Sequence, residues 1–195
     1  MNIIFDIGKV LIDFDYESFV KDLLGEPAAE KVIEATWKSP YWIEFDKGNL
    51  SDEEVLRLFI SRAPDCEKEI REVFARLGSV PKMRPTTIPM IDRLKAEGHK
   101  VYFLSNYFQY LIHVCPWALE FRSHMDGGVF SCFEHLVKPM PEIYQLLCDR
   151  YSLDPKDSVF IDDSPVNVEG AERFGIRAIL YTGQTPDQLH AEIFG

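Results

Sequence analysis

The sequence is poor in positive charge. It has 21 lysines and arginines against 32 aspartates and glutamates among 195 residues, so its formal net charge is −11. Such a chain repels the phosphate backbone of nucleic acids, and no local basic patch is visible that would reverse this. The same deficit argues against a polybasic membrane-surface protein. An anionic substrate would therefore need a metal ion or a few local cations at its site.

Long apolar runs and closely paired cysteines are also missing. No run approaches the roughly 18 apolar residues of a membrane span, and the first residues do not resemble a secretory signal. The cysteines are widely spaced and form no CxxC pair, at Cys66, Cys115, Cys132 and Cys148. Because 46% of the residues are apolar, the chain can bury a large core without disulfides. We expect free thiols and a cytoplasmic protein.

Short apolar segments alternate with helical patterns over much of the chain. The expected strands are 2–5, 101–104, 159–161 and 178–181, and the expected helices lie around 90–98, 108–114, 143–151 and 168–174. Strands that are apolar throughout are typical of a parallel sheet with helices on both faces. We therefore expect a doubly wound, Rossmann-like α/β fold.

The stretch from about residue 16 to residue 77 is different, because its apolar residues recur at helical spacing only. Ser51 followed by three acidic residues predicts the N-terminus of one of its helices. This block interrupts the α/β pattern directly after the first strand. We expect residues 1–14 and 84–195 to form an α/β core and residues 15–83 to form a helical cap.

Polar residues follow three of the expected strands, at Asp6, at Ser105-Asn106 and at Asp162-Asp163. Each alone is also a common cap of the next helix. If the three strands are neighbours, their polar ends meet at one edge of the sheet, where ligands bind in such folds. Carboxylates gathered there repel one another unless a cation lies among them, and oxygen ligands suit Mg²⁺. Lys138, in a loop expected at the same edge, would offset acidic charge and bind an anion.

These elements, in this order and spacing, resemble the haloacid dehalogenase (HAD) superfamily of phosphohydrolases. The motifs are FDIGKVL (5–11), FLSN (103–106), VKPMPEIY (137–144) and FIDDSPVNVEGA (160–171). The resemblance covers the whole chain, because the helical block stands where the family's small helical cap does. The branch that is most similar contains small bacterial sugar-phosphate phosphatases, whose first motif also has glycine two residues after the nucleophile.

The resemblance implies that Asp6 is the nucleophile, forming a phospho-aspartate that water then hydrolyses. Lys138 would neutralise charge on the phosphate and on Asp6. Ser105 and the amide that follows it, at Asn106, would hold a phosphoryl oxygen. The substrate would be a small phosphorylated metabolite, with a sugar phosphate favoured.

The resemblance also implies a Mg²⁺ site. Asp6 and Asp163 would bind the ion through their carboxylates and Gly8 through its backbone carbonyl, while Asp162 would orient a metal-bound water. The metal and the lysine would together explain how a chain of net charge −11 accepts an anionic substrate.

The first motif departs from the pattern of many members, which carry a second aspartate two residues after the nucleophile. That aspartate protonates the leaving group, a contribution typically worth about 10²–10⁴-fold, and here the position is Gly8, followed by Lys9. We favour substrates with acidic leaving groups, such as sugar-1-phosphates or acyl phosphates. Two further explanations stay open: another proton donor (Asp13, Lys9 or a group in the cap), or weak activity.

Two other functions also stay open. A phosphate- or partner-binding protein with weak or no turnover would account for Gly8 and Lys9. A 2-haloacid dehalogenase lacks the second aspartate too, but such relatives usually lack the acidic pair Asp162-Asp163 because they need no metal. For the phosphatase we expect a monomer or a weak homodimer.

An aromatic cluster in the expected cap has two interpretations. It either packs between helices or forms a wall that stacks on a sugar ring, and its members are Trp37, Tyr41, Trp42 and Phe45.

Overall fold

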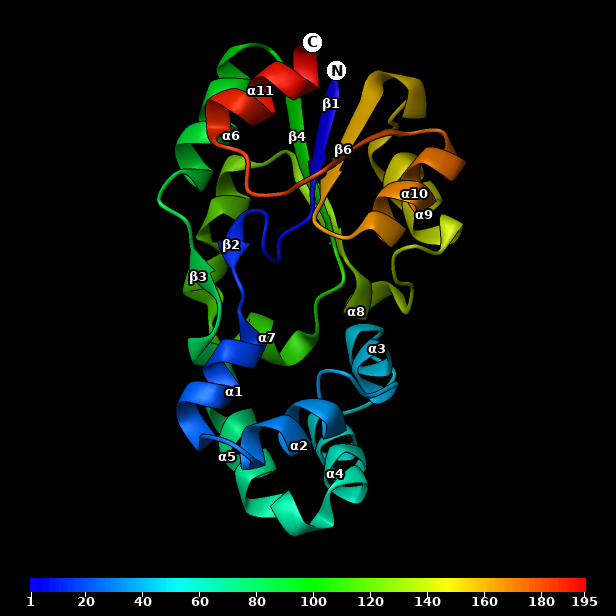
Figure 1. Cartoon of the computed structure of the whole chain (residues 1–195). Helices are drawn as coiled ribbons and strands as arrows, with labels where there is room; N and C mark the ends of the chain where they lie inside the picture. The colour runs from blue at the N-terminus through cyan, green and yellow to red at the C-terminus, as the bar shows by residue number, and fades with distance from the viewer.

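The computed structural model describes residues 1–195 and has a five-stranded parallel sheet at its centre (Figure 1). In spatial order the strands are β5 (Gly127–Phe130), β4 (Lys100–Ser105), β1 (Asn2–Phe5), β6 (Ser158–Asp162) and β7 (Arg177–Leu180). β1 pairs in parallel with both β4 and β6, so the strand order reverses at β1. Ligands bind at the carboxyl ends of the strands near such a switch point. The predicted α/β class is confirmed.

Successive residues of each strand face opposite sides of the sheet and build two hydrophobic cores. Ile3 and Phe5 belong to a large core that α6 (Thr87–Ala96) and α11 (Pro186–Phe194) cover. Ile4 belongs to a smaller core beneath α9 (Pro141–Tyr151) and α10 (Pro165–Phe174). Burial on both faces explains why the strands are apolar throughout, and it holds their carboxyl ends on a rigid scaffold.

The chain between β2 (Ile12–Asp13) and β3 (Lys82–Met83) forms a block of helices. They are α1 (Tyr16–Leu24), α2 (Ala28–Ala35), α3 (Tyr41–Asp46), α4 (Asp52–Arg62), η1 (Pro64–Cys66), α5 (Glu67–Arg76) and η2 (Leu77–Ser79). β2 and β3 pair antiparallel, so the chain leaves and re-enters the α/β part at one place. Figure 1 shows the block beyond the carboxyl ends of the sheet strands, on the side where the switch point opens.

The predicted helix start at Ser51 is confirmed. The Ser51 hydroxyl accepts a hydrogen bond from the backbone N–H of Glu54, and the Glu54 carboxylate accepts one from the backbone N–H of Ser51. This reciprocal cap satisfies two donors that the first turn of α4 would otherwise leave free.

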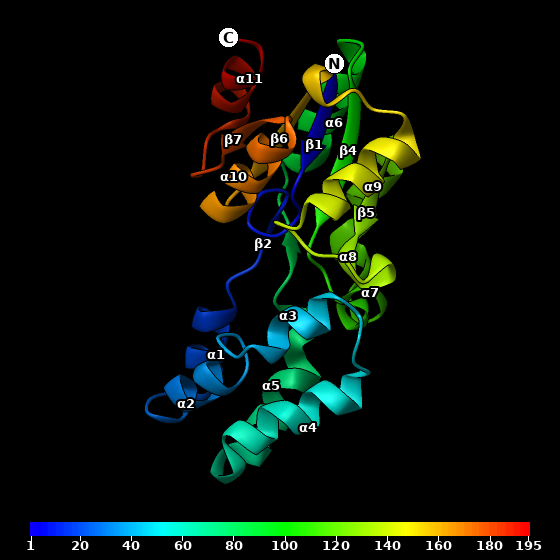
Figure 2. The same cartoon turned by 90° about the vertical axis from the view of Figure 1, so that its right-hand side faces the viewer.

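The helical block contacts the α/β part at two places: α3 packs against α8 (Ser131–Glu134) and η2 packs against α7 (Gln109–Val114) (Figure 2). The Ser131 hydroxyl donates a 2.6 Å hydrogen bond to the backbone carbonyl of Asp46. Gly48 follows α3 with φ +69°, and a Cβ there would lie 2.2 Å from the carbonyl oxygen of Cys132. Only glycine fits so close an approach, so the contact between α3 and α8 is tightly packed.

Several elements lie outside the sequence-based expectation. They are β5, α8, α11, the β2–β3 pair and the short helices η3 (Pro116–His124) and η4 (Pro155–Asp157). β5 begins with Gly127 and Gly128, and a Cβ on Gly128 would lie 2.3 Å from the Phe103 ring. Two glycines leave too few apolar side chains for a strand pattern, because neighbouring rings fill their space. α7 (Gln109–Val114) was expected and is present.

All four cysteines are buried and free, as the sequence predicts. None of the helices combines the length and the apolar character needed to cross a membrane.

Candidate active site

The polar residues that follow β1, β4 and β6 meet at the switch point, as predicted from the sequence. The backbone N–H of Asp6 donates a 2.8 Å hydrogen bond to the carbonyl of Ile161 in β6, which fixes the end of β1 beside its neighbour. Asn106 follows β4, and Asp162 ends β6. The parallel register therefore brings residues from three distant parts of the chain to one edge.

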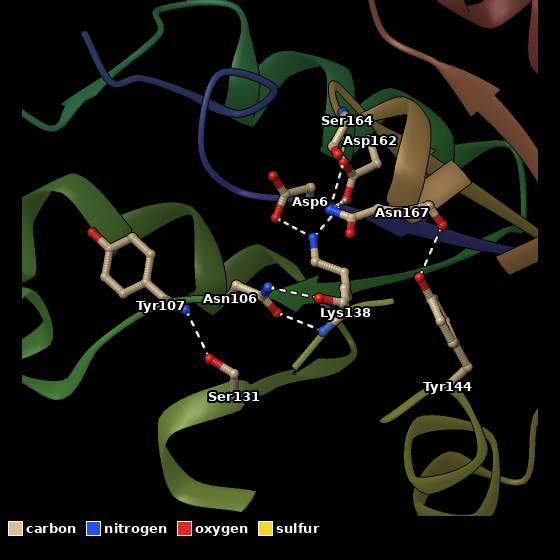
Figure 3. A network of polar contacts seen from close by, with 9 residues as sticks. All are labelled: Asp6, Asn106, Tyr107, Ser131, Lys138, Tyr144, Asp162, Ser164 and Asn167. Atoms are coloured by element: carbon tan, nitrogen blue, oxygen red, sulfur yellow. Dashed lines mark hydrogen bonds and ion pairs between the residues drawn. The ribbon is translucent and has the colours of Figure 1, made fainter. Parts of the chain in front are cut away.

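Lys138 lies at the centre of this edge (Figure 3). Its ammonium Nζ is 2.7 Å from Asp6 Oδ1 and 2.6 Å from Asp162 Oδ2, and its side chain is 1% exposed. Asn106 holds the lysine's backbone from both sides, because its Oδ1 accepts from the Lys138 N–H at 2.8 Å and its Nδ2 donates to the Lys138 carbonyl at 3.1 Å. The loop before α9 thus aims the only cation of this buried group between two carboxylates.

Asp162 supports the lysine and is itself fully buried. Its Oδ1 accepts from the backbone N–H of Ser164 at 2.8 Å, and the Asn167 amide donates to both of its oxygens at 3.1 Å. Tyr144 donates from its hydroxyl to the Asn167 carbonyl at 2.9 Å and ties α9 to α10. Protein donors thus occupy both oxygens of Asp162.

The electrostatics of the group depend on burial. Burial raises the pKa of Asp6 to about 6, although the Lys138 ammonium lowers it and the Asp162 carboxylate raises it further. Burial alone would lower the pKa of Lys138, but the charges of Asp162 and Asp6 outweigh burial and hold it above its ordinary value. The lysine is therefore cationic, and a second cation beside Asp6 would hold its carboxyl ionised at lower pH.

Asp163 faces the opening of the site and is partly buried. Burial, together with the charge of Asp162, raises the pKa of Asp163. Ligand oxygens of Asp6, Asp162 and Asp163 lie within 4.8 Å of one another. Such a group of carboxylate oxygens, with no histidine or cysteine, fits a hard divalent cation.

Lys9 lies at the rim of this acidic group. Its backbone is left-handed, with φ 59°, and its Nζ is 3.9 Å from Asp163 Oδ2 and 5.9 Å from the centre of the Trp37 ring. Its side chain is 53% exposed, so the ammonium is solvated while it still faces the opening.

A cavity of about 440 Å³ opens from Asp6 toward the helical block. This volume is within the usual range for small-molecule sites. Its polar lining is Asp6, Gly8, Lys9, Asp46, Asn106, Lys138, Asp163, Ser164 and Asn167, and its apolar lining is Phe14, Trp37, Trp42, Tyr107, Phe108 and Leu111. Ser105 is buried, 1% exposed, and does not line the cavity, although it adjoins Asn106.

The aromatic cluster of the helical block divides between the cavity lining and the packing of the two parts of the chain. Trp37 and Trp42 line the cavity, whereas Tyr41 and Phe45 do not. Phe45 instead stacks on Phe108 of the α/β part, with ring centres 4.3 Å apart. The cluster therefore joins the two parts of the chain and presents two indole rings to the cavity.

Asp46 is a cavity residue that the sequence analysis did not identify. It ends α3, is 7% exposed, and shares the cavity with Asp6 and Lys138. A signal existed in the sequence, because Trp42 and Asp46 are four residues apart and so lie on one helix face. The contact of α3 with α8, which turns that face toward the site, could not be deduced from local spacing.

Comparison with known proteins gives a family match. The family model of haloacid dehalogenase-like hydrolases matches residues 1–175. The D-ribitol-5-phosphate phosphatase of Bacteroides thetaiotaomicron is 27% identical over 191 residues, covering 89% of this chain and 88% of the relative. Mouse acyl-CoA dehydrogenase family member 10 is 32% identical over 143 residues, but the match spans 71% of this chain and only 13% of that protein.

A solved structure agrees over nearly the whole length. A HAD family enzyme of B. thetaiotaomicron, solved as a magnesium complex, superimposes with a TM-score of 0.78, covering 97% of each chain at 23% identity. The same enzyme was also solved with magnesium and inorganic phosphate.

Proposed function

The chain belongs to the haloacid dehalogenase-like hydrolase family, and from that premise we propose that it is a Mg²⁺-dependent phosphatase acting through an aspartyl phosphate on Asp6. One observation carries the proposal: a buried lysine lies between the candidate nucleophile and Asp162, beside a further acidic residue, Asp163. Such a site has both a nucleophile and the positive charge that phosphoryl transfer needs.

The donor set supports a magnesium site. Asp6 and Asp163 would hold the ion, with the backbone carbonyl of Gly8, because all three line the cavity. Asp162 is proposed to orient a metal-bound water, although protein donors already occupy both of its oxygens. When bound, Mg²⁺ would neutralise charge on the phosphoryl group and keep Asp6 ionised.

The chain's own residues would perform the reaction as follows. An Asp6 oxygen attacks phosphorus, the bond to the leaving oxygen breaks, and water later hydrolyses the acyl phosphate to regenerate Asp6. Lys138 neutralises charge on Asp6 and on the phosphoryl oxygens. Asn106 keeps Lys138 in place through two contacts of its side-chain amide with the Lys138 backbone, and its own backbone N–H is proposed to bind a phosphoryl oxygen. The same role expected for Ser105 is not supported, because Ser105 is buried and does not line the cavity.

We propose a small phosphorylated metabolite as substrate, with a sugar phosphate favoured and sugar-1-phosphates first among these. The volume of about 440 Å³ suits such a molecule, and the rings of Trp37 and Trp42 offer a surface for a sugar. The similarity to a D-ribitol-5-phosphate phosphatase supports the same class. We also propose that the protein is cytoplasmic and that it is a monomer or a weak homodimer. Size-exclusion chromatography with light scattering would test the oligomeric state.

We expect hydrolysis of p-nitrophenyl phosphate to depend on Mg²⁺. The p-nitrophenolate leaving group needs little protonation, so the absence of an acidic side chain at Gly8 should not prevent turnover of this ester. EDTA should abolish turnover, and excess Mg²⁺ should restore it. Asp163→Asn should raise the Mg²⁺ concentration for half-maximal rate by at least about 10–100-fold, a loss seen even for residues that only support a ligand.

The matched control for that measurement is Asp149→Asn on the exposed side of α9, which should leave the Mg²⁺ requirement unchanged. Turnover that survives EDTA would contradict the metal-dependent mechanism. Halide release from a 2-haloacid without phosphatase activity would favour the dehalogenase. Tight metabolite binding without turnover would favour the alternative function, a phosphate- or partner-binding protein with weak or no turnover.

A further inference from the structure

The cap supplies a buried carboxyl that the proposed mechanism does not yet use. Asp46 is only 7% exposed and lines the same cavity as Asp6 and Lys138. No protein hydrogen bond contributes to its electrostatics, which are governed by burial and by those two charges. A carboxyl without a protein hydrogen-bond partner, in a cavity of about 440 Å³, is available to a substrate.

The backbone around Asp46 is held to the α/β part by polar contacts. The backbone N–H of Tyr107 donates to the Ser131 hydroxyl at 2.9 Å, and that hydroxyl donates to the Asp46 carbonyl at 2.6 Å. One residue on, the Lys47 carbonyl lies 3.0 Å from Nδ1 of His135. Together with the close approach of Gly48 to α8, these contacts fix the end of α3 over the site.

The titratable groups that interact with Asp46 are Lys138 in the loop before α9, Asp6 after β1 and Cys132 on α8. Burial raises the pKa of Asp46 to about 8, while the Lys138 ammonium lowers it and the Asp6 carboxylate raises it. Burial raises the pKa of the Cys132 thiol on α8, and the negative charge of Asp46 raises it further. Burial therefore favours the protonated form of the Asp46 carboxyl, which is the form that a general acid needs.

We propose that Asp46 is the proton donor that replaces the aspartate missing at Gly8. As Asp6 attacks phosphorus, the P–O bond to the leaving group breaks and the Asp46 carboxyl gives its proton to the leaving oxygen. The Asp46 carboxylate then takes a proton from the water that attacks phospho-Asp6, so the acid is regenerated when phosphate leaves. This inference rests on the proposed phosphatase function.

The source of the proton has a consequence for substrate range. With Gly8 alone, only esters with acidic leaving groups would react quickly. With Asp46 in place, phosphates of ordinary alcohols also become substrates, provided that α3 is docked on α8. Substrates would thus extend from sugar-1-phosphates to phosphates on primary hydroxyl groups.

The test compares three esters of increasing leaving-group basicity: p-nitrophenyl, phenyl and benzyl phosphate, each with Mg²⁺. Asp46→Asn should lower kcat/KM by about 10²–10⁴-fold for benzyl phosphate but by less than about 10-fold for p-nitrophenyl phosphate. The retained activity on p-nitrophenyl phosphate shows that the variant is folded. Wild-type kcat/KM for benzyl phosphate should also fall as alkaline pH deprotonates Asp46, and this limb should be absent in Asp46→Asn.

Glu44→Gln is the matched control, because it makes the same chemical change on the same helix, where Glu44 pairs with Lys47 outside the cavity. It should not alter the dependence on the leaving group. An Asp46→Asn loss that is equal for all three esters, or no loss at all, overturns the inference while leaving the phosphatase intact. Failure of the wild type to hydrolyse even p-nitrophenyl phosphate overturns the proposed function and the role of Asp46 with it.

Discussion

Asp6→Asn is expected to reduce kcat for p-nitrophenyl phosphate by roughly 10⁴–10⁶-fold, the scale of loss seen when an enzyme loses its nucleophile. The amide nitrogen and oxygen cannot form the acyl phosphate, so both half-reactions stop. The fold should persist, because Asn has nearly the same shape and Lys138 keeps its contact with Asp162. Steady-state rates measured with saturating Mg²⁺ give the direct comparison.

Two further measurements secure this result. Acid quenching of the wild type during turnover should trap phosphate on the protein, and the variant should trap none. Asp149→Asn makes the same change on an exposed residue outside the cavity and should retain activity. If Asp6→Asn kept more than about a hundredth of the wild-type rate, another nucleophile would have to be sought.

Lys138→Met is expected to lower both stability and activity. It leaves Asp6 and Asp162 buried without a counter-charge, and breaking a buried ion pair in this way costs about 3–5 kcal/mol. For a chain of this length that loss corresponds to a fall in Tm of roughly 6–20 °C. The missing charge should also lower kcat by about 10²–10³-fold, as for other groups that stabilise a transition-state anion.

Mg²⁺ should separate the two effects of Lys138→Met. A divalent cation beside Asp6 restores part of the lost positive charge, so Mg²⁺ should raise the Tm of the variant more than that of the wild type. Lys38→Met removes an exposed lysine that pairs with Glu34 and should leave Tm unchanged. A melting temperature for Lys138→Met within a degree of the wild type would contradict the role given to this lysine.

The sheet and its polar edge could be predicted from the sequence because both depend on local patterns. Each apolar strand followed by a polar residue, at Asp6, Ser105 or Asp162, can be recognised from its local sequence alone. Because parallel strands have their carboxyl ends at one edge of the sheet, these residues are then expected to lie together. α11 also has a local signal, since Thr185 and Gln188 cap it reciprocally, although the sequence-based expectation does not include this helix.

Other features depend on contacts between distant residues. β5 was missed because the rings of Phe103 and Tyr151 occupy the space of side chains that Gly127 and Gly128 lack. The place of Asp46 depends on a bond to Ser131, 85 residues away. No periodicity within α3 reveals which partner its end will meet.

Because Gly48 packs against α8, the reactivity of Cys132 on that helix should report separation of α3 from α8. Cys132, whose carbonyl Gly48 touches, is 4% exposed, and burial raises the pKa of its thiol to about 12. A thiol reagent therefore reacts with Cys132 only after α3 separates from α8, because the reactive form is the accessible thiolate. The rate of that modification measures how often α3 separates from α8, and its slowing by bound phosphate would report how firmly product holds the two parts together.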